Sequence, residues 1–172
     1  MLKKSILVTF FFCSLLSALS PSQAQTGKMT LTSPEFEPNQ FIPAKFSCAG
    51  SDINPQLNIS GIPPATRSLA LIVDDPDAPM GTWVHWLVYN IAPTSSIPQN
   101  SAPGKLGKNS FNRGEYGGPC PPSGTHRYFF KIYALDRELE FRTNPTKKEL
   151  ENAMQGHILD KAELIGLYAK GD

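Results

Sequence analysis

Short hydrophobic runs separated by turns rich in proline and glycine dominate the pattern along this chain. The 172 residues include 16 prolines and 13 glycines, which are scattered along the chain rather than gathered in one linker. Short apolar runs between such turns are typical of the strands of all-β domains. The pattern therefore predicts strands over residues 29–33, 41–46, 56–60, 68–73, 83–91, 128–135 and 159–169.

Three features refine this prediction. The run Ser68–Val73 is almost entirely apolar, which indicates a central strand that is buried on both faces. Thr146 and Glu149 form the capping box of the one helix that we predict, and Gly156 would end that helix. The stretch 92–124 shows little periodicity, and a loop of that length in a small domain is usually functional or irregularly packed.

The first 24 residues have the pattern of a cleavable secretory signal peptide. Lys3 and Lys4 precede the apolar run Ile6–Leu16, which is too short for a confident membrane span, and Ser22–Ala24 is a small-x-small cleavage site. An uncut anchor is the alternative. We predict that residues 1–24 are removed, that residues 25–172 form a single domain, and that the protein is periplasmic or secreted. No later run reaches transmembrane length.

Charge and cysteine content narrow the function classes. The formal net charge is only +1, and the leader contributes two of the lysines, which argues against a nucleic-acid partner. Export would carry Cys48 and Cys120 into an oxidising compartment, where disulfides form. A disulfide between them and two separate buried thiols are both open, because the sequence does not fix the distance between their Cα atoms.

Two loop segments place ionisable side chains beside rigid proline and glycine residues, and each adjoins a predicted strand. The first is Asp75–Pro79, followed by Trp83–His85, and the second is Gly117–Pro122, followed by His126–Tyr128. We predict that the two segments form the halves of one small polar pocket at the edge of a sheet.

The first segment carries two acidic residues, Asp75 and Asp77. Side chains at i and i+2 of an extended chain point the same way, and Pro76 favours extension of the residue before it. We therefore expect both carboxylates to face one space, with Asp74 turned away as a solvated or turn residue. Capping of a local turn is the alternative role for Asp75 and Asp77.

The histidines follow the alternation of their strands. One face of the strand at 83–91 should carry Trp83, His85, Leu87 and Tyr89. The same alternation places His126 beside Tyr128 and directs Arg127 outward as an ion-pair residue. A lone histidine on an apolar face is usually a core residue, but two histidines beside such loops favour a shared site.

Two imidazoles with one or two carboxylates suit three kinds of site. In an anion site the histidines donate N–H groups, Asp75 raises their pKa, and free amides of Gly117 and Gly118 assist. A metal site is the second reading, although tight ligand spacing is missing. Hydrolysis is the third and needs a nucleophile such as Cys120, whose flanking prolines favour a structural role instead. We favour the anion site and expect no metal, no other cofactor and no enzymatic activity.

The two segments, in this order and spacing, resemble the signature regions of the phosphatidylethanolamine-binding proteins, also called the Raf kinase inhibitor protein family. The segment Phe46–Pro55 resembles the bacterial branch of that family, and the resemblance extends from about Leu31 to Tyr168. It implies an all-β fold, a sandwich of two antiparallel sheets with Greek-key links and one or two short helices.

The resemblance also implies a cavity that accepts phosphate-like and carboxylate anions, including the phosphoethanolamine head group. The residues that it assigns to this cavity are Asp75, His85 and His126 at the floor, Asp77, Pro79 and Trp83 in one wall, and Gly118, Cys120, Pro121 and Tyr128 in the other. We therefore expect an exported, non-catalytic protein that binds a small anion or a phospholipid head group. The alternative is an inhibitor or interaction module whose loops around the pocket dock a secreted enzyme or another protein.

Overall fold

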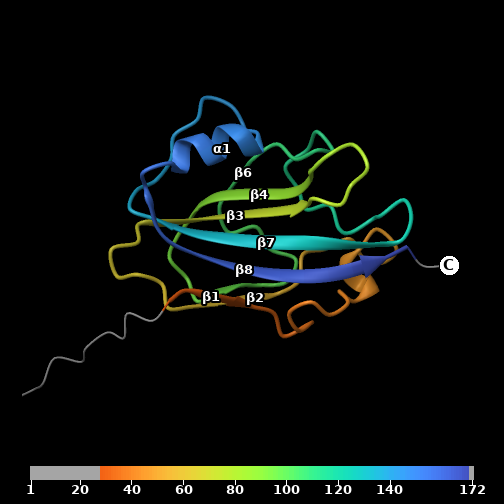
Figure 1. Ribbon diagram of the computed structural model, residues 1–172. Coiled ribbons are helices and arrows are strands. Elements are labelled where there is room, and N and C mark those ends of the chain that lie inside the picture. The colour runs from red at the N-terminus through yellow and green to blue at the C-terminus, as the bar shows by residue number, and fades with distance from the viewer. Residues whose placement is uncertain (1–27, 171–172) are drawn as a thin grey trace, which may run out of the picture.

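The computed structural model describes residues 28–170 and consists mostly of strands in two antiparallel sheets, with one α-helix (Figure 1). The larger sheet has the order β6 (Lys105–Leu106), β4 (Trp83–Ile91), β3 (Ser68–Asp75), β7 (Thr125–Leu135) and β8 (Ile158–Ala169). The smaller sheet has the order β1 (Thr30–Thr32), β2 (Leu57–Ser60) and β5 (Ser96–Ile97). The predicted β class is thereby confirmed, whereas the sandwich arrangement and its Greek-key links stay a prediction. The predicted signal peptide, residues 1–24, lies outside the described residues.

Strand β3 occupies the centre of the larger sheet, between β4 and β7, and all its residues are buried. Leu69, Leu71 and Val73 enter one hydrophobic cluster, whereas Ala70 and Ile72 enter another. Successive side chains of a strand point to opposite faces, so the two clusters lie on the two faces of β3. The prediction of a central strand buried on both sides is confirmed.

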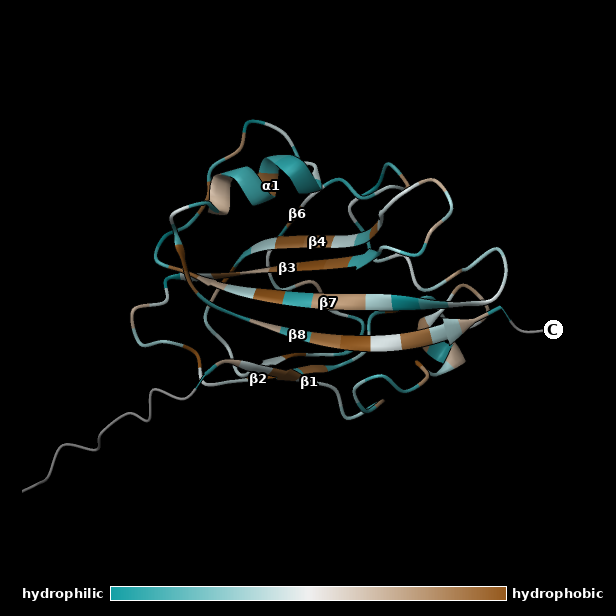
Figure 2. Ribbon diagram, in the orientation of Figure 1, coloured by the Kyte–Doolittle hydropathy of each residue, from teal (hydrophilic) through white to brown (hydrophobic). Residues whose placement is uncertain are grey.

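Each face of the larger sheet has its own cover. The larger cluster joins Leu31 and Leu57 of the smaller sheet to Trp86 and Phe130 of the larger one. The smaller cluster lies under the helix α1 (Lys147–Met154), whose polar side is visible in Figure 2. Among residues 28–170, no helix is long and apolar enough to cross a membrane.

Helix α1 begins with the predicted capping box. The Thr146 hydroxyl accepts a hydrogen bond from the backbone N–H of Glu149, and the Glu149 carboxylate accepts one from the backbone N–H of Thr146 at 2.8 Å. Both bonds satisfy amides that have no partner inside the first turn. The helix ends at Met154, and Gly156 follows with φ of 78°, a conformation that glycine adopts without strain.

The predicted strand over residues 41–46 is wrong. Phe41 makes a single parallel bridge to Leu167, and residues Ala44–Phe46 form a short 3₁₀ helix, η1. Pro43 lies at the start of that turn and has no N–H to donate to a sheet. Ile42 and Phe46 pack on the core from a loop rather than from a strand, whereas Phe41 is exposed.

The expectation that Asp74 is solvated is also wrong. Its carboxylate is completely buried and lies 2.8 Å from Nζ of Lys131 on β7 and 3.0 Å from Nζ of Lys147, the first residue of α1. The helix covers this end of β3, so Asp74 ties the helix to the sheet. Desolvation of a carboxylate is tolerated because two cations and their hydrogen bonds compensate it.

This ion cluster generates a stability prediction. Replacing both lysines, Lys131→Met and Lys147→Met, should lower the free energy of unfolding by about 3–5 kcal/mol, because Asp74 is left as an uncompensated buried charge. Adding Asp74→Asn to that double variant should restore part of the loss, as measured by urea denaturation. Lys148→Met, which changes an exposed lysine on the same helix, is the matched control. A triple variant no more stable than the double variant contradicts the prediction.

Candidate functional site

The polar ends of three neighbouring strands meet at one end of the larger sheet. Asp75 ends β3, Trp83 begins β4, and His126 is the second residue of β7. Antiparallel pairing brings these positions together. A cavity of about 380 Å³ lies here, and the predicted site residues that line it are Asp75, Pro79, Trp83, His85, Cys120, Pro121 and His126.

A β-bulge directs His85 into this cavity. Val73 pairs with Trp86 and Asp74 with Val84, so His85 is an extra residue on β4. A bulge of this kind re-aims a side chain and breaks the alternation of the strand.

The bulge changes the face on which His85 lies. The His85 ring packs edge-on against Tyr128 of the larger cluster, with centroids 5.2 Å apart, whereas Leu87 and Tyr89 belong to the smaller cluster. The prediction that His85 shares its face with Leu87 and Tyr89 is therefore wrong. Its pairing with Trp83 is retained, because both residues line the cavity.

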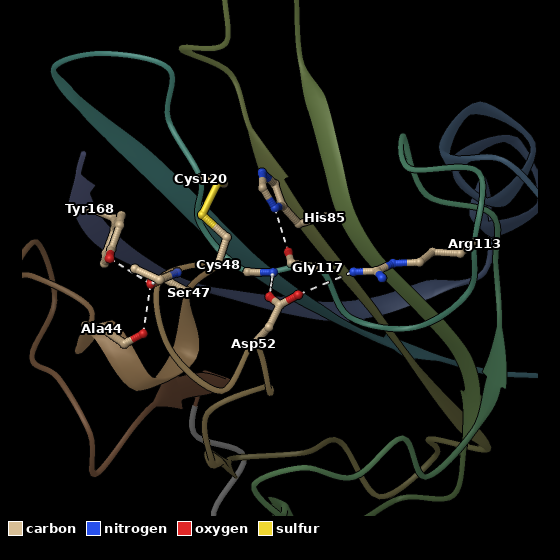
Figure 3. The surroundings of a disulfide bond; sticks show 11 residues. Ala44, Ser47, Cys48, Asp52, His85, Arg113, Gly117, Cys120 and Tyr168 are labelled. Carbon is tan, nitrogen blue, oxygen red and sulfur yellow. Dashed lines mark hydrogen bonds and ion pairs between the residues drawn. A yellow bond between two sulfur atoms is a disulfide. The ribbon is translucent and has the colours of Figure 1, made fainter. Parts of the chain in front are cut away.

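The tautomer of His85 is fixed by a backbone carbonyl. Nδ1 lies 2.6 Å from the carbonyl oxygen of Gly117, and this oxygen can only accept, so Nδ1 carries the proton. The amide of Gly117 donates in return to the backbone oxygen of His85 at 3.2 Å. The second ring nitrogen, Nε2, lies on the far side of the imidazole from Gly117 (Figure 3).

Burial lowers the pKa of His85 below its usual value of 6.5, although the carbonyls of Gly117 and Gly118 and the charge of Asp75 oppose this effect. Asp75 raises the pKa of this histidine, as predicted, but the effect of burial is larger and sets the net direction. His85 is only 4% exposed, and its ring is neutral near neutral pH. Its Nε2 then presents a lone pair, not a proton.

His126 is held by Asp75, as predicted. Nδ1 of His126 lies 2.7 Å from Oδ2 of Asp75, and both residues are buried. The other carboxylate oxygen of Asp75 accepts the backbone N–H of Asp77 at 2.8 Å. The carboxylate thus fixes which nitrogen of His126 faces it, and Nε2 is the nitrogen left for the cavity.

Asp77 does not line the cavity. It forms a bidentate pair with Arg127, with Nε at 2.9 Å and an Nη at 2.7 Å, and it also accepts the backbone N–H of Arg127. The hydrogen bond from Arg127 lowers the pKa of Asp77 from 3.8 to about 2. Asp77 therefore shapes the turn and pins it to β7, and the outward ion-pair role of Arg127 is confirmed.

Gly118 and Tyr128 lie behind the wall rather than in it. A Cβ on Gly118 would collide with the backbone of Phe46 and Ser47, and its amide donates to Asp52 at 2.6 Å. Because the amides of Gly117 and Gly118 are both engaged, the prediction that they are free for an anion is wrong. Tyr128 is 1% exposed, and its ring packs edge-on against the ring of His85.

A disulfide joins Cys48 to Cys120, with the Cα atoms 5.5 Å apart (Figure 3). This bond decides between the two states that the sequence left open. Cys120 contributes to the cavity wall, and the bond ties the loop that carries Gly117 to the segment after η1. The sulfur of Cys120 is therefore not available as a thiolate nucleophile.

Two lining residues, Met80 and Phe111, escaped the sequence analysis, whereas Ala78 and Pro122 lie within the two predicted segments without having been assigned to the site. Phe111 is the most informative of them, because its ring packs edge-on against both Trp83 and His85. It comes from the stretch without periodicity, where Asn109 organises the loop. The Asn109 side chain bonds the backbone oxygens of His85 and Glu115 and accepts the backbone N–H of Phe111. No alternation marks such a loop, so only its unusual length signalled a function.

The described residues 28–170 contain no group of three or more His, Cys, Asp or Glu side chains placed to hold a metal ion.

The profile of the phosphatidylethanolamine-binding protein family matches residues 32–169. This chain belongs to the phosphatidylethanolamine-binding protein family. The match includes every residue that lines the cavity and every strand apart from the first two residues of β1.

Solved structures and curated relatives agree with the family assignment. A phosphatidylethanolamine-binding protein homologue from Chlamydia trachomatis superposes with a TM-score of 0.81 at 42% identity, over 84% of this chain and 99% of that one. The Escherichia coli family member YbcL gives 0.77 at 27% identity, over 84% and 100%. A UPF0098 protein of Pyrococcus horikoshii is 48% identical over 83% of this chain and 78% of its own length.

The disulfide supplies a second stability prediction. The double variant Cys48→Ser, Cys120→Ser should unfold with a free energy lower by about 2–5 kcal/mol, because the unfolded chain loses a long covalent loop. Urea denaturation with and without reductant measures this. Reductant should destabilise the native protein and leave the double variant unchanged. Equal stability of the two oxidised proteins would show that the bond is not formed or contributes nothing.

The lowered pKa of His85 predicts a pH dependence of stability. Below about pH 6.5, the unfolded chain binds a proton at this histidine that the folded protein does not, so stability falls as pH falls. The loss between about pH 7 and pH 5 should be smaller for His85→Gln than for the native protein. Asp77, with its pKa of about 2, loses its contribution only in stronger acid. Parallel pH profiles of the urea midpoint for the two proteins contradict the prediction.

Proposed function

We propose that this protein is an exported, non-catalytic binding protein that holds a phosphate-like or carboxylate group between His126, His85 and Asp75. The observation that carries the proposal is the His126–Asp75 pair at the floor of a cavity with otherwise apolar walls. Small-ligand sites typically combine apolar walls with a few convergent polar groups. Membership in a family named for binding phosphatidylethanolamine supports the same ligand class.

His126 is the residue that meets the anion. Its Nδ1 proton is engaged by Asp75, so Nε2 is the nitrogen that faces the ligand, and it donates when the ring carries a second proton. The charged N–H then donates to an anionic oxygen of the ligand. Walls formed by Trp83 and the prolines exclude water, which strengthens this charge-assisted hydrogen bond.

Two observations support export. The leader has the sequence of a signal peptide, and the domain contains a disulfide, a bond that persists in oxidising compartments. A periplasmic or secreted location follows from the proposal, and detection of the processed chain in the exported fraction tests it.

An interaction module is the second candidate, and one observation favours it. Met80 is 96% exposed and Phe111 is 39% exposed at the mouth of the cavity. Exposed apolar side chains beside a pocket are a common feature of docking surfaces. A protein partner that binds equally well to a pocket variant and is lost on Met80→Glu would favour this candidate.

Calorimetric titration tests the proposed function. Phosphoethanolamine and inorganic phosphate should bind at about pH 6, where histidine side chains begin to charge. His126→Ala should weaken binding about tenfold or more, because a charge-assisted hydrogen bond is lost. His157→Ala is the matched control, since His157 pairs with Asp136 outside the cavity. Absence of binding to the native protein, or an unchanged affinity in His126→Ala, would sink the proposal.

A further inference from the structure

The three polar side chains at the floor of the cavity offer more hydrogen-bond acceptors than donors. The Nδ1 proton of His85 is committed to the Gly117 carbonyl, so the nitrogen that this ring has left for the cavity is the unprotonated Nε2. Asp75 lies beside it as a carboxylate, which can only accept. Two of the three polar side chains of the floor therefore offer lone pairs to a ligand.

His126 is the only one of the three that can donate to the ligand. Its Nδ1 proton is committed to Asp75, so its Nε2 donates only when the ring is charged. The engaged amides of Gly117 and Gly118 supply no further donor. The ligand thus meets at most one donor from the three floor side chains, together with two acceptors, and the indole N–H of Trp83 is a further donor in the wall.

This set of donors and acceptors distinguishes between oxyanions of similar charge and shape. A fully deprotonated oxyanion offers only acceptors, so one of its oxygens would face the lone pair of His85 and the charge of Asp75. An oxyanion with an O–H group can donate that proton to His85 Nε2 and accept from His126 through another oxygen. Leaving a buried polar group without a partner is costly, so the difference should be large.

We propose that the cavity selects oxyanions that retain an ionisable O–H group, namely singly protonated phosphomonoesters and inorganic phosphate, over phosphodiesters and sulfate esters. The proposal rests on the proposed function and names the ligand class of the same site. It assigns His85 the role of a specificity-determining residue, as the acceptor of the ligand's proton. A phosphoethanolamine head group is then bound as the free monoester rather than within an intact phospholipid, where the phosphate is a diester.

The other ionisable groups near the cavity do not change the role of His85 as an acceptor. Asp74 is paired with Lys131 and Lys147 on the far side of β3, and Asp77 is paired with Arg127. Tyr128, which packs against His85, is neutral because burial raises its pKa far above the physiological range. The lowered pKa of His85 agrees with the acceptor role that the Gly117 contact requires.

Calorimetry with three matched anions at about pH 6, near the second pKa of a phosphomonoester, tests the proposal. Methyl phosphate, as its monoanion, and methyl sulfate share charge and shape but differ in the O–H group, and dimethyl phosphate is the corresponding diester. Methyl phosphate should bind at least about tenfold more tightly than either of the others. Equal affinities for the three overturn the selectivity and leave the proposed function standing, whereas no binding by any of them overturns both.

Two variants locate the selectivity. Glutamine at position 85 places an amide that can donate as well as accept, so His85→Gln should reduce the ratio between methyl phosphate and methyl sulfate. His157→Gln makes the same change at a partly exposed histidine outside the cavity and should keep the native ratio. An unchanged ratio in a folded His85→Gln protein overturns the role of His85. If that variant does not fold, the anion series on the native protein still decides the proposal.

A last pair of ligands distinguishes the two biological sources of the head group. Phosphoethanolamine should bind more tightly than glycerophosphoethanolamine, which carries the same ammonium group on a phosphodiester. A preference for the diester would point to intact lipid as the ligand and overturn the proposal.

Discussion

The hydrogen bond from His85 to the carbonyl of Gly117 is the contact on which the chemistry of the site depends. It decides which nitrogen of His85 bears a proton and therefore what the cavity offers a ligand. Three bonds fix the loop that supplies this carbonyl. The amide of Gly117 donates to the backbone oxygen of His85, the amide of Gly118 donates to Asp52, and Cys120 forms the disulfide. The β-bulge on β4 brings His85 to meet it. Because these bonds and the bulge hold both partners, the contact between His85 and Gly117 has a single geometry.

The last two residues of β3, Asp74 and Asp75, have different roles, one structural and one in the candidate site. Asp74 points to the helix side, where two lysines compensate its charge and join α1 to the sheet. Asp75 points to the cavity, where its partners are His126 and a backbone amide. Neighbouring residues of a strand face opposite ways, so one strand end supplies both an ion pair for stability and an acceptor for a ligand.

Patterns of two-residue period and local turn chemistry predicted most of the fold. The strands near residues 57–60, 68–75, 83–91, 125–135 and 158–169 and the capped helix all carry their signals within a few neighbouring residues. The alternation also explains how Asp75 and His126 reach one site, whereas His85 reaches it through the bulge on β4. Errors arose where distant contacts decide the outcome: a bulge set by pairing with β3, the cover that buries Asp74, and the loop position of Phe111. None of these is encoded in local spacing.

Nitrogen NMR of the histidine side chains in the native protein tests the central claim most directly. At about pH 7, the account predicts that Nδ1 of His85 bears the proton and that its Nε2 is unprotonated, because the Gly117 carbonyl accepts from Nδ1 and burial disfavours the charged ring. A proton on Nε2 of His85 at that pH, in either the other neutral tautomer or the charged ring, would contradict the account.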